Sequence, residues 1–347
     1  MTVADQSSLN IQAQAELHHA LLLGLQLMVS TNRSPEEVGD WMFRLFRRQH
    51  LDKFLSSFEK LGLTDLPDAV ACARYHVMSN SVGGVPVEYM YESDQKAWVR
   101  FRYPRWMYHG PTICGVPVGV SRGFLNGWYA HNGVSLNNPW LGYVCVSEDM
   151  TGEFALCGYF KEYDHDLSDD ERLQFAKGEL PPPFKAEEQP VLPTDQWNEE
   201  RLQKANRNYA MDYIRNGLVE LKAVLGDEVT TELGCKAARL IGLQYLTQTR
   251  EIIGVADGDL DTAADYLAKM FDGLGDRVEV QSGDEEIVLV QHDLRIVRGM
   301  SGDERDTVLG IWIELWRGAL SSFRQMKTAE VEVGEDQIRW VIRRRVA

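Results

Sequence analysis

Apolar residues along the first part of the chain recur at the spacing of buried helices. Within residues 11–29 they fall three or four positions apart, which places their side chains on one face of a helix. A second helix is expected after Ser34, because Pro35 suits the first helical position and Glu37 completes an S-x-x-E capping box. We expect this second helix to be interrupted near His50.

The spacing then changes from helical to alternating. Val85–Glu92 and Ala97–Tyr103 are rich in Val, Tyr, Trp and Phe and are expected to pair as an antiparallel hairpin. Cys114–Leu136 returns to a mostly helical pattern, although its glycines weaken each boundary. Leu141–Ser147 and Phe154–Glu162 follow as two more strands, separated by a turn. The expected order is therefore helices, strand, strand, helix, strand, strand.

Residues 164–197 interrupt this order. Asp164–Glu171 is strongly charged, and the run Pro181–Pro183 cannot form a regular helix. Pro-rich segments favour extended, semi-rigid chain. The sequence therefore predicts an N-terminal half at 1–163, a linker at 164–197 and a C-terminal half at 198–347.

The same order of elements returns in the C-terminal half. Helices are expected at 199–225, 229–253, 261–271 and 307–327, and strands at 278–281, 286–291, 329–333 and 337–344. Val87 then corresponds to Val278 and Trp128 to Trp316, which are offsets of 191 and 188 residues. The near-constant offset favours a duplicated architecture, although few residues are identical. We expect an α+β fold of two tandem similar halves, each with helices followed by a ββαββ antiparallel sheet unit.

The second half also carries a family resemblance. Gly310–Leu320 (GIWIELWRGAL) and the strand Gln337–Arg344 resemble the end of the 2-amino-thiazoline-4-carboxylate hydrolase-like proteins and of the related vinyl-reductase-like small-molecule-sensing domains. The resemblance covers 200–345 as a pattern and 10–163 more loosely. It implies an α+β fold that hydrolyses or senses a small molecule. The cysteines of that family near the final helix are absent, since this half contains only Cys235, so the resemblance implies no catalytic residue here.

Composition narrows the classes of partner. Of the 347 residues, 44% are hydrophobic and 25% are charged, which is typical of a globular chain with a substantial core. The net charge of −16 repels phosphate backbones, so no nucleic-acid partner is expected. The apolar stretch 20–29 is too short for a membrane span and follows no basic residue, so neither a membrane association nor a signal peptide is expected. Five widely spaced cysteines without a CxxC pair indicate reduced thiols and a cytoplasmic protein.

Side chains that a core does not need concentrate between residues 100 and 166. His109 and His131 are candidate general bases or metal ligands. Cys114, just before an expected helix, is a candidate nucleophile if a nearby imidazole lowers its pKa. These three residues are the candidate catalytic group.

Three polar residues of the expected helix before the third strand follow helical spacing. Arg122, Asn126 and Tyr129 stand at i, i+4 and i+7, so they share one face, which either faces solvent or lines a pocket. In the pocket interpretation Arg122 holds a substrate carboxylate. The other candidate substrate-binding residues are Tyr108, Trp128, Asn132 and Glu162. Glu162 and Asp164–Asp166 form either an acidic linker start or part of a metal site, which leaves a divalent metal open as cofactor.

Two functions from different classes fit these residues. The GxGxxG, GxxxxGK[ST] and GxSxG motifs are absent, which disfavours nucleotide binding and serine-hydrolase chemistry of the usual kind. The first hypothesis is a small-molecule hydrolase or lyase with a pocket in the N-terminal half that uses His, Cys and carboxylate chemistry. The alternative is a non-catalytic small-molecule-binding or sensor protein of the same fold. A homo-oligomer, such as a dimer, is left open.

Overall fold

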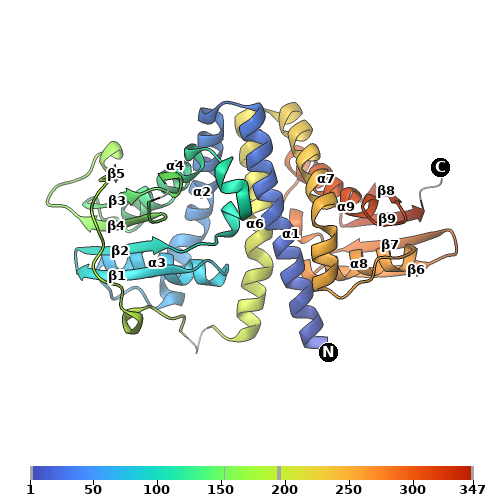
Figure 1. Cartoon of the computed structure of the whole chain (residues 1–347), viewed down its shortest axis with the longest axis horizontal. Helices are drawn as coiled ribbons and strands as arrows, with labels where there is room; N and C mark the ends of the chain where they lie inside the picture. Colours follow the sequence, from blue (N-terminus) through green and yellow to red (C-terminus); the bar gives the residue numbers. More distant parts are fainter. Residues whose placement is uncertain (1–2, 152, 194–196, 345–347) are drawn as a thin grey trace. The chain divides into compact units, whose positions relative to one another are not determined.

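The computed structural model of the chain describes residues 3–151, 153–193 and 197–344. The chain divides into two compact units, which are coloured along the sequence in Figure 1. The central unit is Ser30–Leu202. The terminal unit combines Met1–Val29 with Gln203–Ala347.

The two largest differences between these units and the expected halves concern the first helix and the expected linker. The first helix, α1 (Val3–Asn32), contributes its residues up to Val29 to the terminal unit. The segment 164–197, expected as a linker, belongs to the central unit. The physical reason in both places is packing: each segment buries its side chains against a part of the chain that is distant in sequence.

The central unit is a mixed sheet with helices. Its helices are α2 (Pro35–Phe58), α3 (Asp68–Val82), α4 (Val118–Gly127) and α5 (Asn132–Ser135), and its strands are β1 (Val87–Ser93), β2 (Lys96–Phe101), β3 (Leu141–Ser147), β4 (Cys157–Glu162) and β5 (Leu173–Phe175). The strand order is β1-β2-β4-β3-β5, with all pairs antiparallel except β3 and β5. The helix α3 packs against β1, β2 and β4 (Figure 1).

The helix α2 begins as expected and is not interrupted. Ser34 Oγ accepts from the Glu37 backbone N–H at 3.3 Å, and the Ser34 N–H donates to Glu37 Oε2 at 3.0 Å, so the capping box is confirmed. The predicted interruption near His50 is wrong, because α2 runs without a break to Phe58. The His50 side chain is buried on this helix and forms its hydrogen bonds with other side chains, which leaves the helical backbone intact.

Glycines bring α2 and α4 into close backbone contact. A Cβ atom added at Gly123 would lie 2.8 Å from the Gly39 carbonyl oxygen, and one at Gly127 would lie 2.5 Å from the Phe43 carbonyl oxygen. Any larger residue would separate the two helices. The glycines that weakened the helical pattern in the sequence are therefore required by tertiary packing.

The expected linker packs onto the sheet. Leu173 pairs with Tyr143, so β5 extends the sheet as its one parallel strand among the described residues. Ala176 packs against the cluster around Trp98 on the other sheet face from α3. Further along, the Trp197 indole N–H donates to the Lys60 carbonyl at 3.1 Å. This Pro-rich segment is part of the central unit's structure rather than a spacer.

The terminal unit has a second, purely antiparallel sheet. Besides α1 it contains α6 (Glu199–Leu225, from Gln203 on), α7 (Asp227–Ile252), α8 (Leu260–Leu274) and α9 (Gly302–Ser321), with strands β6 (Arg277–Ser282), β7 (Glu286–His292), β8 (Lys327–Val333) and β9 (Gln337–Arg344). Its strand order is β6-β7-β9-β8, the same as β1-β2-β4-β3 in the central unit. The α+β fold is confirmed, whereas the origin of the two units by duplication stays a prediction.

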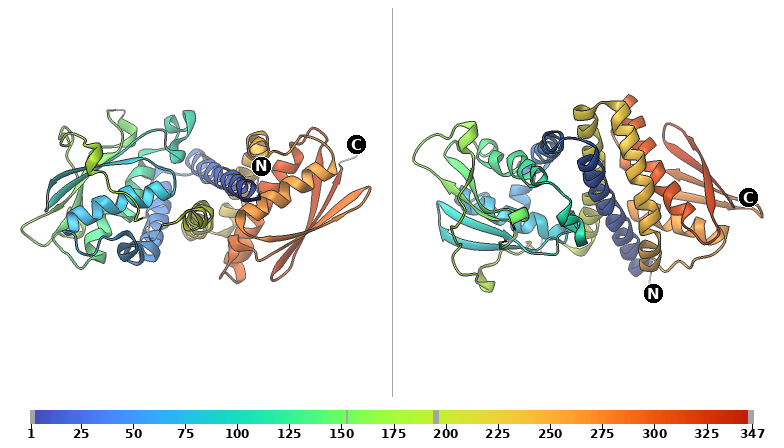
Figure 2. Two further views of the ribbon diagram at one scale, coloured as in Figure 1. Left: turned by 90° about the horizontal axis from the view of Figure 1, so that it is seen from below. Right: turned by 45° about the horizontal axis from the view of Figure 1, so that its top comes forward.

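The helix α1 is buried in the terminal unit, beside α7 (Figure 2). His18 is fully buried, and its Nδ1–H donates to the Gln14 carbonyl at 2.7 Å. Its Nε2 then accepts from the Trp312 indole N–H at 3.0 Å, which joins α1 to α9. The early apolar pattern therefore buries α1 against helices that lie some 300 residues later.

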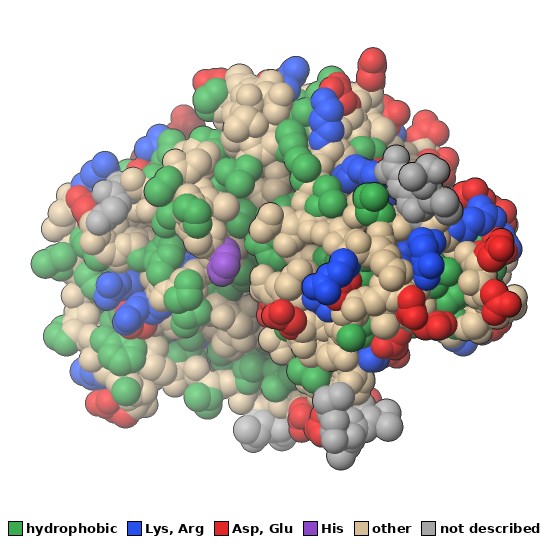
Figure 3. All heavy atoms as spheres, turned by 45° about the vertical axis from the view of Figure 1, so that its right-hand side comes forward, with side chains coloured by type: hydrophobic (Ala, Val, Ile, Leu, Met, Phe, Trp, Pro, Cys, Tyr) green, Lys and Arg blue, Asp and Glu red, His purple; other side chains and the backbone are tan. Residues whose placement is uncertain are grey.

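Two further features concern membrane-spanning helices and the distribution of charged side chains. No helix among the described residues combines the length and apolar character needed to cross a bilayer. On the face shown in Figure 3, acidic and basic side chains are interspersed.

Candidate functional site

His109 and Cys114 lie in the irregular segment before α4. His109 connects the 3₁₀ turns Trp106–Tyr108 and Gly110–Cys114. Both side chains are exposed. Among the described residues, no hydrogen bond or ion pair joins Cys114 to His109 or to His131. A catalytic role for these three residues stays a prediction.

The three polar residues expected on one helix face are separated. The helix α4 ends at Gly127, and Tyr129 lies in the next 3₁₀ turn. Arg122 and Asn126 are exposed, whereas Tyr129 is 1% exposed. Arg122 donates from Nε and Nη2 to the two carboxylate oxygens of Glu148 at 2.8 and 3.1 Å. Its guanidinium is therefore occupied by a side chain of the protein rather than open to a substrate carboxylate.

Asn132 is buried between two histidines rather than facing a ligand. Arg47 Nη1 donates to His50 Nδ1 at 2.8 Å, so His50 carries its proton on Nε2 and donates to Asn132 Oδ1 at 3.2 Å. The Asn132 amide then donates to His76 Nε2 at 3.0 Å. Burial, with Arg47 second, lowers the pKa of His50 to about 3, and burial lowers the pKa of His76 well below its usual value. Both imidazoles are therefore neutral at pH 7.

His131 lies beside His50 but is not part of the hydrogen-bonded series His50–Asn132–His76. Its Nδ1–H donates to the Asn126 carbonyl at 2.8 Å, and its ring centroid is 6.5 Å from that of His50. Burial and the nearby Arg47 lower the pKa of His131. The sequence reasoning missed His50 and His76, because they approach Asn132 from positions 82 and 56 residues away.

Tyr108 belongs to a second buried polar network. Asp149 Oδ1 accepts from Arg105 Nη1 at 2.8 Å, and Asp149 Oδ2 accepts from Ser121 Oγ at 2.9 Å. The Tyr103 hydroxyl also donates to Asp149. The Arg105 guanidinium lies 5.3 Å from the Tyr108 ring centroid, and burial raises the pKa of Tyr108 well above its usual value. The network ties the loop after β2 to α4 and to the turn after β3.

The remaining candidates lie apart. Trp128 packs on His50 with a centroid separation of 5.6 Å and is largely buried. Glu162 is half-buried, and burial with the nearby Asp68 raises its pKa. Asp164, His165 and Asp166 are exposed. Within the described ranges, no group of three or more His, Cys, Asp or Glu side chains is arranged to hold a metal ion.

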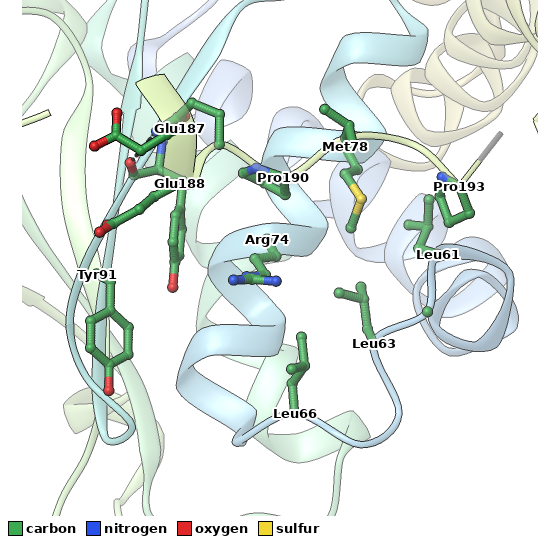
Figure 4. A pocket seen from close by; sticks show the side chains of 14 residues that line it. Leu61, Leu63, Leu66, Arg74, Met78, Tyr91, Glu187, Glu188, Pro190 and Pro193 are labelled. Carbon is green, nitrogen blue, oxygen red and sulfur yellow. Dashed lines mark hydrogen bonds between the residues drawn. The ribbon is translucent and has the colours of Figure 1, made fainter. Parts of the chain in front are cut away.

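A hollow of about 600 Å³ lies elsewhere in the central unit (Figure 4). It is bounded by the residues after α2, by α3, by the edge strand β1 and by residues 185–193, which we call the strap. The apolar part of its lining includes Leu61, Leu63, Leu66, Met78, Pro190 and Pro193. The polar part includes Arg74, Tyr89, Tyr91, Glu187, Glu188 and Gln189. In Figure 4 the leucines and Met78 lie to one side of Arg74, and Tyr91 with the two glutamates lies to the other.

Arg74 and Tyr89 bring two unused donors to this hollow. The Arg74 guanidinium lies over the Tyr89 ring, 5.3 Å from its centroid. Arg74 Nε and the Tyr89 hydroxyl are both buried, and apart from the contact between these two side chains neither has a hydrogen-bond partner in the described part of the chain. Burial raises the pKa of Tyr89, and the adjacent Arg74 opposes that rise. Arg74 also forms no ion pair with any described carboxylate.

The strap is hydrogen-bonded to the backbone of Tyr89 through Gln189. The Tyr89 backbone N–H donates to Gln189 Oε1 at 2.8 Å, and Gln189 Nε2 donates to the Tyr89 carbonyl at 2.7 Å. Gln189 Nε2 also donates to the Lys185 carbonyl at 2.9 Å. The amide of one side chain therefore pairs with the edge strand as a neighbouring strand would.

Neither a protein-family model nor a curated protein sequence matches this chain. The resemblance of the second half to hydrolase-like and sensing domains therefore stays an expectation.

Proposed function

We propose that the central unit is a non-catalytic small-molecule-binding module and that its ligand occupies the hollow between α3, β1 and the strap. The observation that carries this proposal is the Arg74 guanidinium, which lines the hollow beside Tyr89 and has no carboxylate partner among the described residues. A bound ligand that supplies an acceptor would remove the free-energy cost of leaving a buried donor unpaired.

The energetics support a ligand at this place. A buried donor without an acceptor costs about 1–3 kcal/mol, more for a charged group. Folded proteins satisfy nearly all such groups, so each exception requires a specific explanation. The hollow's volume of about 600 Å³ lies in the range of small-molecule sites, and its lining is divided about evenly between apolar and polar side chains.

The chemistry of the lining favours binding over turnover. None of the lining residues is His, Cys, Ser or Thr, so a base or nucleophile in the hollow would have to come from its glutamates or tyrosines. The candidate catalytic residues His109, His131 and Cys114 do not line it. A hydrolase or lyase activity remains the alternative proposal, and it would require a site other than this hollow.

The proposal includes a cytoplasmic location for the protein. All five cysteines are unpaired thiols, which supports a reducing, cytoplasmic location. Whether the protein acts as a homo-oligomer stays a prediction.

To test this proposal, a substitution that fills the hollow is combined with a measurement of how tightly an apolar fluorescent anion binds. Titration with 1-anilinonaphthalene-8-sulfonate is expected to show a saturable site in the wild-type protein. Leu66→Trp places an indole in the hollow and should weaken that site by about tenfold or more. Leu55→Trp is the matched control, because Leu55 is 54% exposed on α2 and does not line the hollow. Equal binding by Leu66→Trp and the control, with both variants folded by circular dichroism, would overturn the proposal.

A further inference from the structure

We propose that the ligand of this hollow is an amphipathic monocarboxylate, with its carboxylate on Arg74 and Tyr89 and its apolar body against the leucines and Met78. This inference rests on the proposed function and adds the ligand's chemical class. Three features of the hollow carry it: the donors at its centre, the apolar side and the acidic side.

The donors at the centre define the head group. Arg74 supplies guanidinium N–H donors in a planar fork, and Tyr89 supplies a hydroxyl beside it. A carboxylate has two oxygens that can accept from both at once, and charge-assisted pairs of this kind are the stronger hydrogen bonds. No described carboxylate pairs with Arg74, so the ligand would also supply the missing counter-charge.

A neutral or cationic head group fits less well. An alcohol could accept one hydrogen bond but would leave the half-buried Arg74 charge without a counter-ion. A quaternary ammonium would place a like charge near Arg74 and would accept no hydrogen bond from Arg74 or Tyr89. The head group is therefore expected to be an anion.

The apolar side defines the body. Leu61, Leu63 and Met78 line the hollow next to Pro190 and Pro193, with most of each side chain packed in the core. In Figure 4 this surface extends from Arg74 towards the residues after α2. A chain or an aryl group attached to the carboxylate would lie along it and exclude water.

The acidic side limits the charge. Glu188 is paired with Lys185 at 2.6 Å, whereas Glu187 is exposed at the same end of the strap. Two carboxylates beside the polar part of the hollow repel a second negative charge on the ligand. A monocarboxylate is therefore preferred to a phosphomonoester, which carries up to two charges at neutral pH. Solvent screening keeps this preference modest.

The test compares probes that share one tail and differ in the head group. Isothermal titration of the full-length protein is made with octanoate, octan-1-ol, octyl phosphate and octyltrimethylammonium. Octanoate is expected to bind about tenfold or more tightly than octan-1-ol. Octyl phosphate should bind less tightly than octanoate, and octyltrimethylammonium should bind least.

Variants assign the preference to named side chains. Arg74→Gln should lower octanoate affinity by about tenfold and leave octan-1-ol nearly unchanged. Arg74→Lys, which keeps the charge but not the fork, should fall between. Arg44→Gln is the control, because Arg44 is exposed on α2 and pairs with Asp40 outside the hollow. The double variant Glu187→Gln/Glu188→Gln should gain affinity for octyl phosphate, a result that misfolding cannot produce.

The outcomes separate this inference from the proposed function. If octan-1-ol binds as tightly as octanoate, or Arg74→Gln loses no octanoate affinity, the carboxylate assignment is overturned. If octyl phosphate binds more tightly than octanoate, the preference for a single charge is overturned. In either event the sensitivity of fluorescent-anion binding to Leu66→Trp still decides the proposed function independently.

Discussion

Gln189 and Tyr89 are joined through both polar atoms of one side-chain amide. The Gln189 amide accepts from the Tyr89 N–H and donates to the Tyr89 carbonyl, at 2.8 and 2.7 Å. The Tyr89 side chain faces the hollow at the same position of β1. The fastening of the strap and the lining of the hollow therefore meet at a single residue.

Replacing Gln189 should loosen the strap without unfolding the sheet. Gln189→Ala removes the hydrogen bonds to Tyr89 and Lys185, and we expect a loss of about 1–2 kcal/mol in local stability. Amide hydrogen exchange of Tyr89 and of the strap should accelerate by about tenfold, as measured by mass spectrometry of peptides covering both. Gln174→Ala is the control, since its amide donates to the Glu171 carbonyl and Gln174 lies on β5, outside the strap. Unchanged exchange at Tyr89 in Gln189→Ala would show that the strap is held by other contacts.

Removing the amide between the two buried histidines should destabilise the central unit. Asn132→Ala leaves His50 Nε2–H and His76 Nε2 buried without partners, and each such group costs about 1–3 kcal/mol. Urea unfolding should report a loss of about 2–5 kcal/mol in the free energy of unfolding. Asn126→Ala, at an exposed position of α4, should stay within about 0.5 kcal/mol of wild type. Similar midpoints for the two variants would contradict the role assigned to Asn132.

Acidification should destabilise the central unit through His50. Its folded pKa of about 3 lies below the usual value of 6.5, so the folded state binds fewer protons than the unfolded state. The contribution of His50 is therefore present above pH 6.5 and is lost as the pH falls. Between pH 7.5 and pH 5 this group alone should remove about 2 kcal/mol. Urea unfolding of wild type and His50→Gln over this range should show a shallower pH dependence in the variant, and equal slopes would contradict the assignment.

In the terminal unit, Asp276 makes the free energy of unfolding depend on pH in the opposite direction from His50. Burial raises the pKa of Asp276 to about 6, because the hydrogen bonds from Gln291 and from the Arg295 N–H only partly offset the loss of hydration. The folded state then binds the proton more tightly than the unfolded state, so this contribution is present below pH 3.8 and is lost as the pH rises through about 6. Unfolding should be followed separately in the two units, by hydrogen exchange of peptides from each, so that the two effects do not cancel.

The effect of replacing a helical glycine by alanine should depend on which atoms the added methyl group meets. Gly123→Ala places a methyl group 2.8 Å from the Gly39 carbonyl oxygen and should cost about 1–3 kcal/mol by separating α2 from α4. Gly310 lies inside α9 with nothing within 4 Å of an added Cβ, so Gly310→Ala should stabilise the protein by about 0.5–1 kcal/mol. Thermal unfolding of the two variants measures both signs. A stabilised Gly123→Ala variant would contradict the close packing of the two helices.

The sequence alone determined most of the long helices and strands of this protein, because these depend on nearby residues. The capping box of Ser34 and Glu37 forms with the expected bonds, and the helix expected at 199–225 has those bounds. The alternation in Gln337–Arg344 predicted a strand with the observed limits. Spacing and capping act within a few residues, so they can be read before the chain is folded.

The sites required the tertiary structure because their residues meet across long separations. Asn132 resembled a ligand contact in the sequence, yet packing of α2 and α3 places it between His50 and His76. Arg74, Tyr89 and Gln189 come from a helix, an edge strand and a segment expected to be a linker. No local spacing relates such positions, since their approach depends on how helices and strands bury their faces against one another.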